Sequence, residues 1–202
     1  MHPEGHRALS SDLETTSCID PLRPTGEQAV AGHEARKLVR VEPDSDLWEA
    51  IRELVHRHDR EFEPPISDRT TIRDYVEQFR HPPGFMIAAL DGDDVVACVG
   101  GFVSHPERHV PFLRYAVVDF EYRRGHIATR LLEAAMTLLA ERGGASVEAA
   151  TWSTNAVSRT LLVRLGFELI ERHEDDRGSG IDTLLYARAL PHTEEDPGAT
   201  GA

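Results

Sequence analysis

A basic turn ahead of a long helical pattern is the part of this sequence best suited to chemistry. An apolar run ends at Val117 and Val118, and Arg123, Arg124 and Gly125 then precede a stretch with apolar residues at helical spacing. The first N–H groups of a helix have no partner within it and lie at its positive end, so this terminus suits a phosphate or diphosphate. An ordinary surface helix with a basic first turn is the alternative interpretation, and the segment alone does not decide between them.

This segment resembles one known phosphate-binding pattern, and the chain lacks two others. The chain has neither the P-loop pattern GxxxxGKS/T nor the dinucleotide pattern GxGxxG. It resembles the acyl-CoA-binding motif Q/R-x-x-G-x-G/A of the GNAT (GCN-related N-acetyltransferase) superfamily. Arg123 matches the leading residue and Ala128 the final small residue, whereas His126 stands where the family normally has its first glycine. The same register aligns Leu131 and Leu132 with the family's leucine pair.

A second block, about 30 residues further on, resembles the family pattern NxxAxxLYxxxGF. Asn155, Leu161, Gly166 and Phe167 match it, and Ser158 replaces the small alanine. A helix N-cap at Asn155 and a helix end at Gly166 would explain these residues without any function. Two blocks in the expected order form a joint signal, and the resemblance covers residues 36–190.

The resemblance implies a fold and a reaction. Acetyl-CoA, as co-substrate, would lie in a cleft where two parallel central strands splay apart, and backbone groups of the strand ending at Val118 would pair with its pantetheine arm. The N–H of Val118 would polarise the thioester carbonyl. The residues that the resemblance assigns to the co-substrate are Val117, Val118, Arg123, Arg124, Gly125, His126, Ile127, Ala128, Thr129, Asn155 and Ser158. An acceptor amine would attack the thioester directly in a ternary complex, so we expect an acyl-CoA-dependent N-acyltransferase that acetylates a primary amine of a small molecule.

The general acid is the sharpest departure from the family pattern. The family uses the tyrosine of the LY pair to protonate the departing thiolate, and Leu162 occupies that position here. Tyr115 and Tyr186 lie on expected strands and are candidates for the role, although buried strand tyrosines more often serve packing. Leu162 also motivates a different class of function, a non-catalytic GNAT-fold module that binds acyl-CoA as a sensor or interaction domain.

The general base is left open by the sequence. An amine of pKa near about 10 is protonated at neutral pH, so a carboxylate, a histidine or a chain of waters must remove its proton. Glu148 could do so through a water molecule, or it could be solvated or paired with a cation. His105 and His109 could lie over the acceptor, or they could be ordinary surface residues.

The acceptor pocket of the family is shaped by two N-terminal helices and their connection, here residues 58–65. The acids Asp59, Glu61 and Glu63 in this connection could attract a cationic amine, or they could form a solvated charge cluster. Transfer to a protein N-terminus or a lysine is a further alternative. Homodimers are common in the family, but no feature of this sequence demonstrates one.

The elements that would position these residues follow the order β-α-α-β-β-β-α-β-α-β-β. The expected strands cover 38–41, 85–90, 95–103, 111–118, 146–151, 167–171 and 183–190, and the expected helices cover 47–55, 68–79, 125–142 and 155–165. The fold class is therefore α/β. With the resemblance, we expect the GNAT acyl-CoA N-acyltransferase fold: a central, mixed, strongly twisted sheet flanked by helices, with splayed central strands.

Length and charge bound the remaining classes of function. The chain has 202 residues and a net charge of −13, of which residues 1–34 carry −4 and residues 191–202 carry −3. We expect both ends to be disordered acidic tails around a GNAT N-acetyltransferase domain at 35–190. The acidic balance argues against nucleic-acid binding. The sequence has two cysteines, no metal-ligand spacing, no apolar run of transmembrane length and no secretory signal pattern, so we expect a cytoplasmic protein without a metal or a membrane partner.

Overall fold

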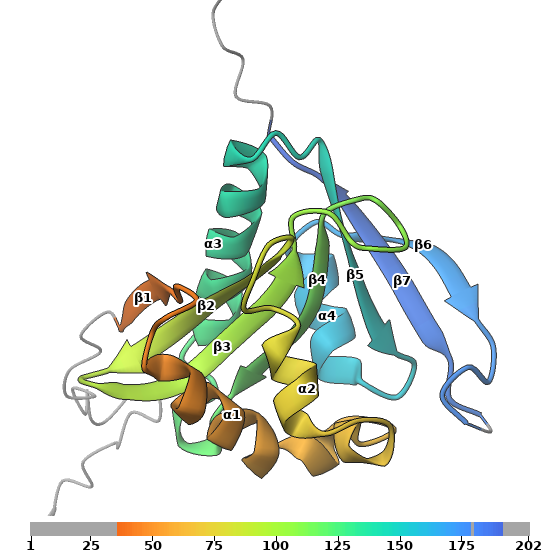
Figure 1. Ribbon diagram of the computed structural model, residues 1–202. Helices are drawn as coiled ribbons and strands as arrows, with labels where there is room; N and C mark the ends of the chain where they lie inside the picture. Colours follow the sequence, from red (N-terminus) through yellow and green to blue (C-terminus); the bar gives the residue numbers. More distant parts are fainter. Residues whose placement is uncertain (1–35, 179, 192–202) are drawn as a thin grey trace, which may run out of the picture. The chain divides into compact units, whose positions relative to one another are not determined.

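A seven-stranded mixed sheet forms the centre of the computed structural model, which describes residues 36–178 and 180–191 (Figure 1). The strand order is β1-β2-β3-β4-β5-β7-β6. The β4–β5 pair is parallel, and the other five neighbouring pairs are antiparallel. The strands are β1 (Lys37–Arg40), β2 (Gly84–Asp91), β3 (Asp94–Phe102), β4 (Phe112–Val118), β5 (Ser146–Trp152), β6 (Glu168–His173) and β7 (Thr183–Ala189).

Helices cover both faces of this sheet. They are α1 (Leu47–Arg57), α2 (Ile72–Glu77), α3 (Ile127–Glu141) and α4 (Ala156–Arg164), with short 3₁₀-helices at Asp59–Glu61, Ile66–Asp68 and Phe120–Tyr122. In Figure 1, α1 and α2 lie on one side of the sheet and α3 and α4 on the other. Side chains of α1 and α2 share one buried apolar cluster with one face of the sheet, and side chains of α3 and α4 share a second cluster with the other face. The expected α/β class and the expected order of strands and helices are therefore confirmed.

The two parallel strands separate soon after they meet. β4 and β5 are paired only at Phe112 with Glu148 and at Leu113 with Ala149, although each strand has seven residues. Beyond these two pairs the strands diverge, and Val117 and Val118 lie on the part of β4 that β5 does not cover. The splayed central strands expected from the resemblance are present.

A β-bulge in β4 lies at the point of divergence. On the neighbouring strand, Gly101 is opposite Leu113 and Gly100 is opposite Tyr115, so Arg114 has no partner residue on β3. A Cβ atom at Gly101 would lie 2.3 Å from the carbonyl oxygen of Phe112, and one at Gly100 would lie 2.5 Å from the ring of Tyr115. Only glycine fits at these two positions, so the glycine pair is part of what permits the bulge.

Two helices start later than expected. α2 begins at Ile72 because the Thr71 hydroxyl accepts a hydrogen bond from the Asp74 N–H at 3.0 Å, and the residues before it form a separate 3₁₀-helix. α3 begins at Ile127 rather than at residue 125, because Arg124 and His126 have left-handed φ angles of 65° and 57° that interrupt a helix. These differences move the boundaries without changing the element order.

The two expected tails lie outside the described residues, apart from position 191. Within the described part of the chain, the helices are too short or too polar to serve as membrane spans.

Candidate active site

The loop before α3 has a left-handed backbone at the position where the family motif has its first glycine. Arg123 is extended, Arg124 and His126 are left-handed, and α3 then starts at Ile127. His126 stands at the motif's glycine position, and its φ of 57° explains that preference, because the left-handed region favours glycine. This geometry supports the motif register in which Arg123 leads and Ala128 follows His126.

The first turn of α3 is open to a ligand. It contains no acidic residue, and His126 makes no side-chain cap to it within the described structure. Ile127 is buried in the core, so it can offer a ligand only its backbone N–H, whereas Ala128 and Thr129 are half-buried and Arg124 is exposed. An unfilled set of helix N–H groups beside exposed positive charge fits a diphosphate.

Arg123 is already engaged by the protein. Its Nε donates to the carbonyl oxygen of Val118 at 3.0 Å, and its Nη2 donates to the two carboxylate oxygens of Glu61 at 2.8 and 2.9 Å. The guanidinium also lies 4.2 Å from the ring centre of Phe120. The motif arginine therefore ties the end of β4 to the segment after α1.

Glu61 and His58 complete this cluster. His58 is buried, and its Nδ1 lies 2.5 Å from a Glu61 carboxylate oxygen. Burial would raise the pKa of Glu61, but the hydrogen bonds from Arg123 and His58 outweigh that effect and hold the pKa below its usual value. Glu61 is therefore a charged, internally paired carboxylate at neutral pH.

The other acids of the α1–α2 connection are also paired. Asp59 accepts hydrogen bonds from the backbone N–H and the hydroxyl of Ser67 at 3.0 and 2.5 Å, and Glu63 accepts one from the Thr154 hydroxyl. Internal groups hold these carboxylates and Asp59 is buried, so the acids are bonded within the protein rather than forming the solvated cluster of the alternative interpretation, and none of them lines the cavity described below.

The second family block caps α4. The Asn155 side chain accepts a hydrogen bond from the Ser158 N–H at 3.0 Å, which is the N-cap interpretation that the sequence left open. Leu162, at the family's tyrosine position, is buried in the apolar cluster on the α3–α4 face. It has no group that can donate a proton.

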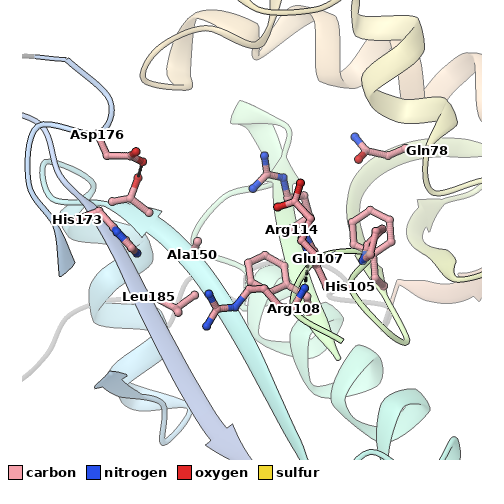
Figure 2. A pocket seen from close by; sticks show the side chains of 13 residues that line it. Gln78, His105, Glu107, Arg108, Arg114, Ala150, His173, Asp176 and Leu185 are labelled. Carbon is pink, nitrogen blue, oxygen red and sulfur yellow. Dashed lines mark hydrogen bonds between the residues drawn. The ribbon is translucent and has the colours of Figure 1, made fainter. Parts of the chain in front are cut away.

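A polar cavity of about 430 Å³ lies over the divergence of β4 and β5, on the face that carries α1 and α2 (Figure 2). It contains Arg114 of β4 and Ala150 of β5, the first residues after the last pair of these strands. The residues that line it are Gln78, Phe102, His105, Pro106, Glu107, Arg108, Phe112, Arg114, Ala150, His173, Asp176, Thr183 and Leu185. This position, beside the cleft expected for the thioester, suits an acceptor molecule.

Glu148 is paired rather than free. Its carboxylate accepts hydrogen bonds from Arg108, one of them at 3.3 Å from Nη2, and these bonds raise the pKa of the Arg108 guanidinium. The sequence left open whether Glu148 is paired with a cation or acts as a base through a water molecule, and the structure shows the ion pair. Glu148 thus holds Arg108, which lines the cavity, and is not itself part of the lining.

The two candidate tyrosines lie in packing positions on opposite faces of the sheet. Tyr115 packs against Tyr75 and Phe79, and burial raises the pKa of its phenol well above the ordinary value. Tyr186 belongs to the other apolar cluster, with Leu162. Neither lines the cavity, so the structure does not bring these phenols to the proposed reaction centre.

Of the two candidate histidines, His105 lines the cavity and His109 does not. The Nδ1 of His105 faces the backbone N–H groups of Glu107 and Arg108 at 3.2 and 3.3 Å, so it accepts from them and Nε2 carries the proton. Burial and the nearby Arg114 lower the pKa of His105. His105 is therefore a neutral hydrogen-bond donor toward the cavity rather than a base.

Sequence reasoning did not identify Arg114, Asp176 and Thr183 as site residues. A signal existed for Arg114, since it is the one charged residue in the apolar run from Phe112 to Val118. Asp176 and Thr183 come from the β6–β7 connection, whose position over the cavity follows only from the strand order. No group of three or more metal-binding side chains occurs within residues 36–178 and 180–191.

Solved structures of several acetyltransferases resemble this fold. An aminoglycoside 6'-N-acetyltransferase in complex with coenzyme A has 18% identity and a TM-score of 0.64, and the match covers 77% of this chain and 98% of that one. The aminoglycoside 6'-N-acetyltransferase from Enterococcus faecium has 17% identity, a TM-score of 0.64 and coverages of 77% and 98%. The ribosomal-protein-S18-alanine N-acetyltransferase from Escherichia coli has 16% identity, a TM-score of 0.62 and coverages of 79% and 98%. At these identities the likeness concerns the fold.

Family membership rests on the sequence match. No curated protein matches the chain. The sequence profile of the Acetyltransferase (GNAT) family matches residues 48–167, more than half of the chain's 202 residues, and this range contains both motif blocks, β4, α3 and β5. The chain therefore belongs to the GNAT family of acetyltransferases.

Proposed function

We propose that this protein transfers the acetyl group of acetyl-CoA to a primary amine of a small molecule, by direct attack within a ternary complex. One observation carries the proposal: β4 and β5 diverge after two residue pairs, and the open first turn of α3 and a polar cavity adjoin this divergence. Donor and acceptor can therefore meet at one place from two sides of the sheet.

The donor side uses the residues that the motif assigns to it. The N–H groups of Ile127, Ala128 and Thr129 and the exposed guanidinium of Arg124 would hold the diphosphate. The uncovered part of β4 at Val118 would offer backbone groups to the extended arm of the donor. When bound, the thioester supplies an activated acyl group.

The acceptor side must deliver a neutral amine. The cavity provides Glu107, Asp176 and His173 as groups that can accept a proton, directly or through water. Leu162 has no proton to donate to the departing thiolate. We therefore propose that the thiolate is protonated by the proton that leaves the amine, or by solvent. Such an enzyme would be expected to work without a dedicated tyrosine acid.

The test combines donor binding with turnover. Calorimetry should show saturable acetyl-CoA binding, and replacing both Arg123 and Arg124 by glutamine should weaken it about tenfold or more, since each charge-assisted contact to phosphate is worth about 1.5–3 kcal/mol. The matched control replaces Arg73 and Arg142, which lie on α2 and at the far end of α3, and should bind normally. Release of free thiol is then screened across amino acids, polyamines, aminoglycosides and peptides. Absence of heat at millimolar acetyl-CoA would exclude the proposal.

The second candidate function is an acyl-CoA-binding sensor without catalysis. It is favoured by one observation, the buried Leu162 at the position of the family's acid. The same screen separates the two, because a sensor binds acetyl-CoA normally but releases no thiol with any amine above the rate of hydrolysis. Acetylation of peptides alone would instead indicate transfer to a protein N-terminus or lysine.

A further inference from the structure

Arg114 lies in the cavity beside the bulge in β4. It is the residue without a partner on β3, between Leu113 and Tyr115, and it lines the cavity together with Phe112, two residues earlier on the same face of the strand. Figure 2 shows Arg114 extending from β4 between Gln78 and the connection that carries Asp176. The guanidinium therefore stands at the mouth of the strand divergence.

This guanidinium has no anionic partner within the described residues, whereas its neighbours are neutralised or held. Arg108 pairs with Glu148 and lies 3.9 Å from Glu171. Arg177 donates to the Thr183 hydroxyl at 2.9 Å and to a backbone carbonyl. Arg114 makes no ion pair with any described carboxylate, including Glu107 and Asp176 of the same cavity.

Two further guanidinium groups lie near Arg114. Burial raises the pKa of the Tyr75 phenol, while the charges of Arg114, Arg69 and Arg177 and a hydrogen bond with Arg114 act on it in the opposite direction. Burial together with the charges of Arg69 and Arg114 lowers the pKa of Arg177. The Asp176 carboxylate, for its part, accepts a hydrogen bond from the Thr183 hydroxyl at 2.5 Å. A guanidinium without an ion pair to any described carboxylate thus faces the place where the acceptor would bind, in a cavity that also carries Glu107 and Asp176.

We propose that Arg114 binds an acid group of the acceptor, so that the preferred substrate is an amine that carries a carboxylate or a phosphate close to its amino group. The inference rests on the proposed acetyltransferase function and names its substrate class. A planar guanidinium binds either oxyacid through two hydrogen bonds. Its charge also disfavours the ammonium form of the neighbouring amine, which helps to present the neutral nucleophile, and it disfavours polycationic acceptors.

The experiment compares amines that differ only in the acid group. Rates of thiol release from acetyl-CoA are measured with L-amino acids against their amides, and with aminoethyl phosphate against ethanolamine. The acid should exceed its neutral partner in kcat/KM by about tenfold or more, as expected for a charge-assisted hydrogen bond. The carboxylate and phosphate arms show which oxyacid is recognised. Spermidine should be a poorer acceptor than either.

Variants test whether Arg114 is the residue responsible. Arg114→Gln should abolish the preference for the acid over its neutral partner, Arg114→Lys should retain part of it, and the exposed Arg73→Gln should leave it unchanged. The variants' melting temperatures identify any loss of folding. Equal rates for acids and amides with the wild-type protein would overturn the inference while leaving the acetyltransferase function intact.

A binding measurement makes the test independent of turnover. With coenzyme A present, calorimetry should detect N-acetyl amino acids but not the corresponding N-acetyl amides, and Arg114→Gln should lose this difference. Failure of both pairs to bind would overturn the inference even if acetyl-CoA itself binds. Preferential transfer from succinyl-CoA to neutral amines, lost in Arg114→Gln, would also overturn it, because the guanidinium would then recognise the acyl group.

Discussion

Arg123 and Glu61 form a two-oxygen ion pair at 2.8 and 2.9 Å, which joins the loop before α3 to the segment after α1. Arg123 is also the residue that the family motif assigns to the diphosphate. The carboxylate of Glu61 is therefore bound to the guanidinium that an incoming phosphate would use. The phosphate of the donor would have to compete with Glu61 for Arg123.

Glu61→Gln should tighten acetyl-CoA binding by about 1.4- to fivefold, because exposed ion pairs of this kind are worth about 0.2–1 kcal/mol. Glu49→Gln, which alters an ion pair on the surface of α1, is the matched control. Calorimetry at constant ionic strength measures the change. Because the folded-state pKa of Glu61 is lowered, the pair stabilises the fold above the usual glutamate pKa and is lost as the pH falls through the lower folded value. An unchanged affinity in Glu61→Gln would show that Arg123 does not reach the donor.

His126→Gly should retain or raise the stability of the fold. A left-handed backbone at a residue other than glycine costs the folded state about 1–2 kcal/mol, which the variant regains. Glycine also gives the unfolded chain more conformational freedom, and this reduces the gain by about 0.4–1 kcal/mol. Urea unfolding should therefore show a change between zero and about 1.6 kcal/mol in favour of the variant. His126→Val, whose branched side chain tolerates this φ poorly, should be clearly less stable than wild type. A stability loss in His126→Gly would mean that the imidazole makes a favourable contact.

Gly101→Ala should destabilise the protein by about 1–3 kcal/mol, the usual cost of overpacking. The added methyl would meet the Phe112 carbonyl at 2.3 Å, and backbone at the bulge can yield only by changing the bulge itself. Gly92→Asn is the control, because this hairpin glycine has a φ of 61° and open space around it. Chemical unfolding gives the stability, and the acceptor preference of the surviving protein reports on Arg114. Wild-type stability in Gly101→Ala would contradict this account of the bulge.

Glu148→Gln should lower kcat/KM by less than about tenfold, whereas removal of a general base usually costs about 10²–10⁴-fold. The reason is that Glu148 pairs with Arg108 and so positions a residue of the cavity. The pH profile of kcat/KM should keep its shape with whichever acceptor the thiol-release screen identifies. Glu171→Gln, which removes the more distant acid near Arg108, is the control. A loss of the ascending limb of the pH profile would restore Glu148 as the base.

Cys98 should be inert to thiol reagents in the native protein. Burial raises the pKa of its thiol to about 12, so the reactive thiolate is absent at neutral pH. In a Cys18→Ser background, Cys98 is the sole cysteine and should react with a chromogenic disulfide only after denaturant is added. Since the folded pKa lies above the unfolded value, the stabilising effect is complete below the unfolded pKa and declines as the pH rises beyond it. Rapid labelling without denaturant would indicate frequent opening of β3.

The sequence predicted the elements of this fold because their signals are local. The acidic turn between β2 and β3, the apolar stripe of α3 and the Asn155 cap each depend on a few neighbouring residues, and all three are present. Boundaries failed where conformation departs from the average, as at Arg124 and His126, whose left-handed backbones no propensity would favour.

The candidate site was harder to predict because its residues come from distant parts of the chain. The motif arginine could be found by pattern, but its pairing with Glu61 joins positions 62 residues apart. Arg114 lies on the same face of β4 as Phe112, and the one-residue bulge then brings Tyr115 to this face too, where it packs against Tyr75 and Phe79. The bulge breaks the strand alternation that sequence reasoning assumes, so the position of Tyr115 in the chain gave no indication of this packing.

The short pairing between β4 and β5 divides the sheet into two portions. Two residue pairs join a four-stranded portion, β1 to β4, to a three-stranded portion, β5 to β7, so the continuity of the backbone ladder is weakest at the centre of the protein. An extended ligand that hydrogen-bonds to the exposed edges of both portions would fasten them together. Because such a ligand binds only the folded chain, the free energy of unfolding would rise with the ligand's concentration. The supply of the acyl donor would therefore be linked to the stability of the protein.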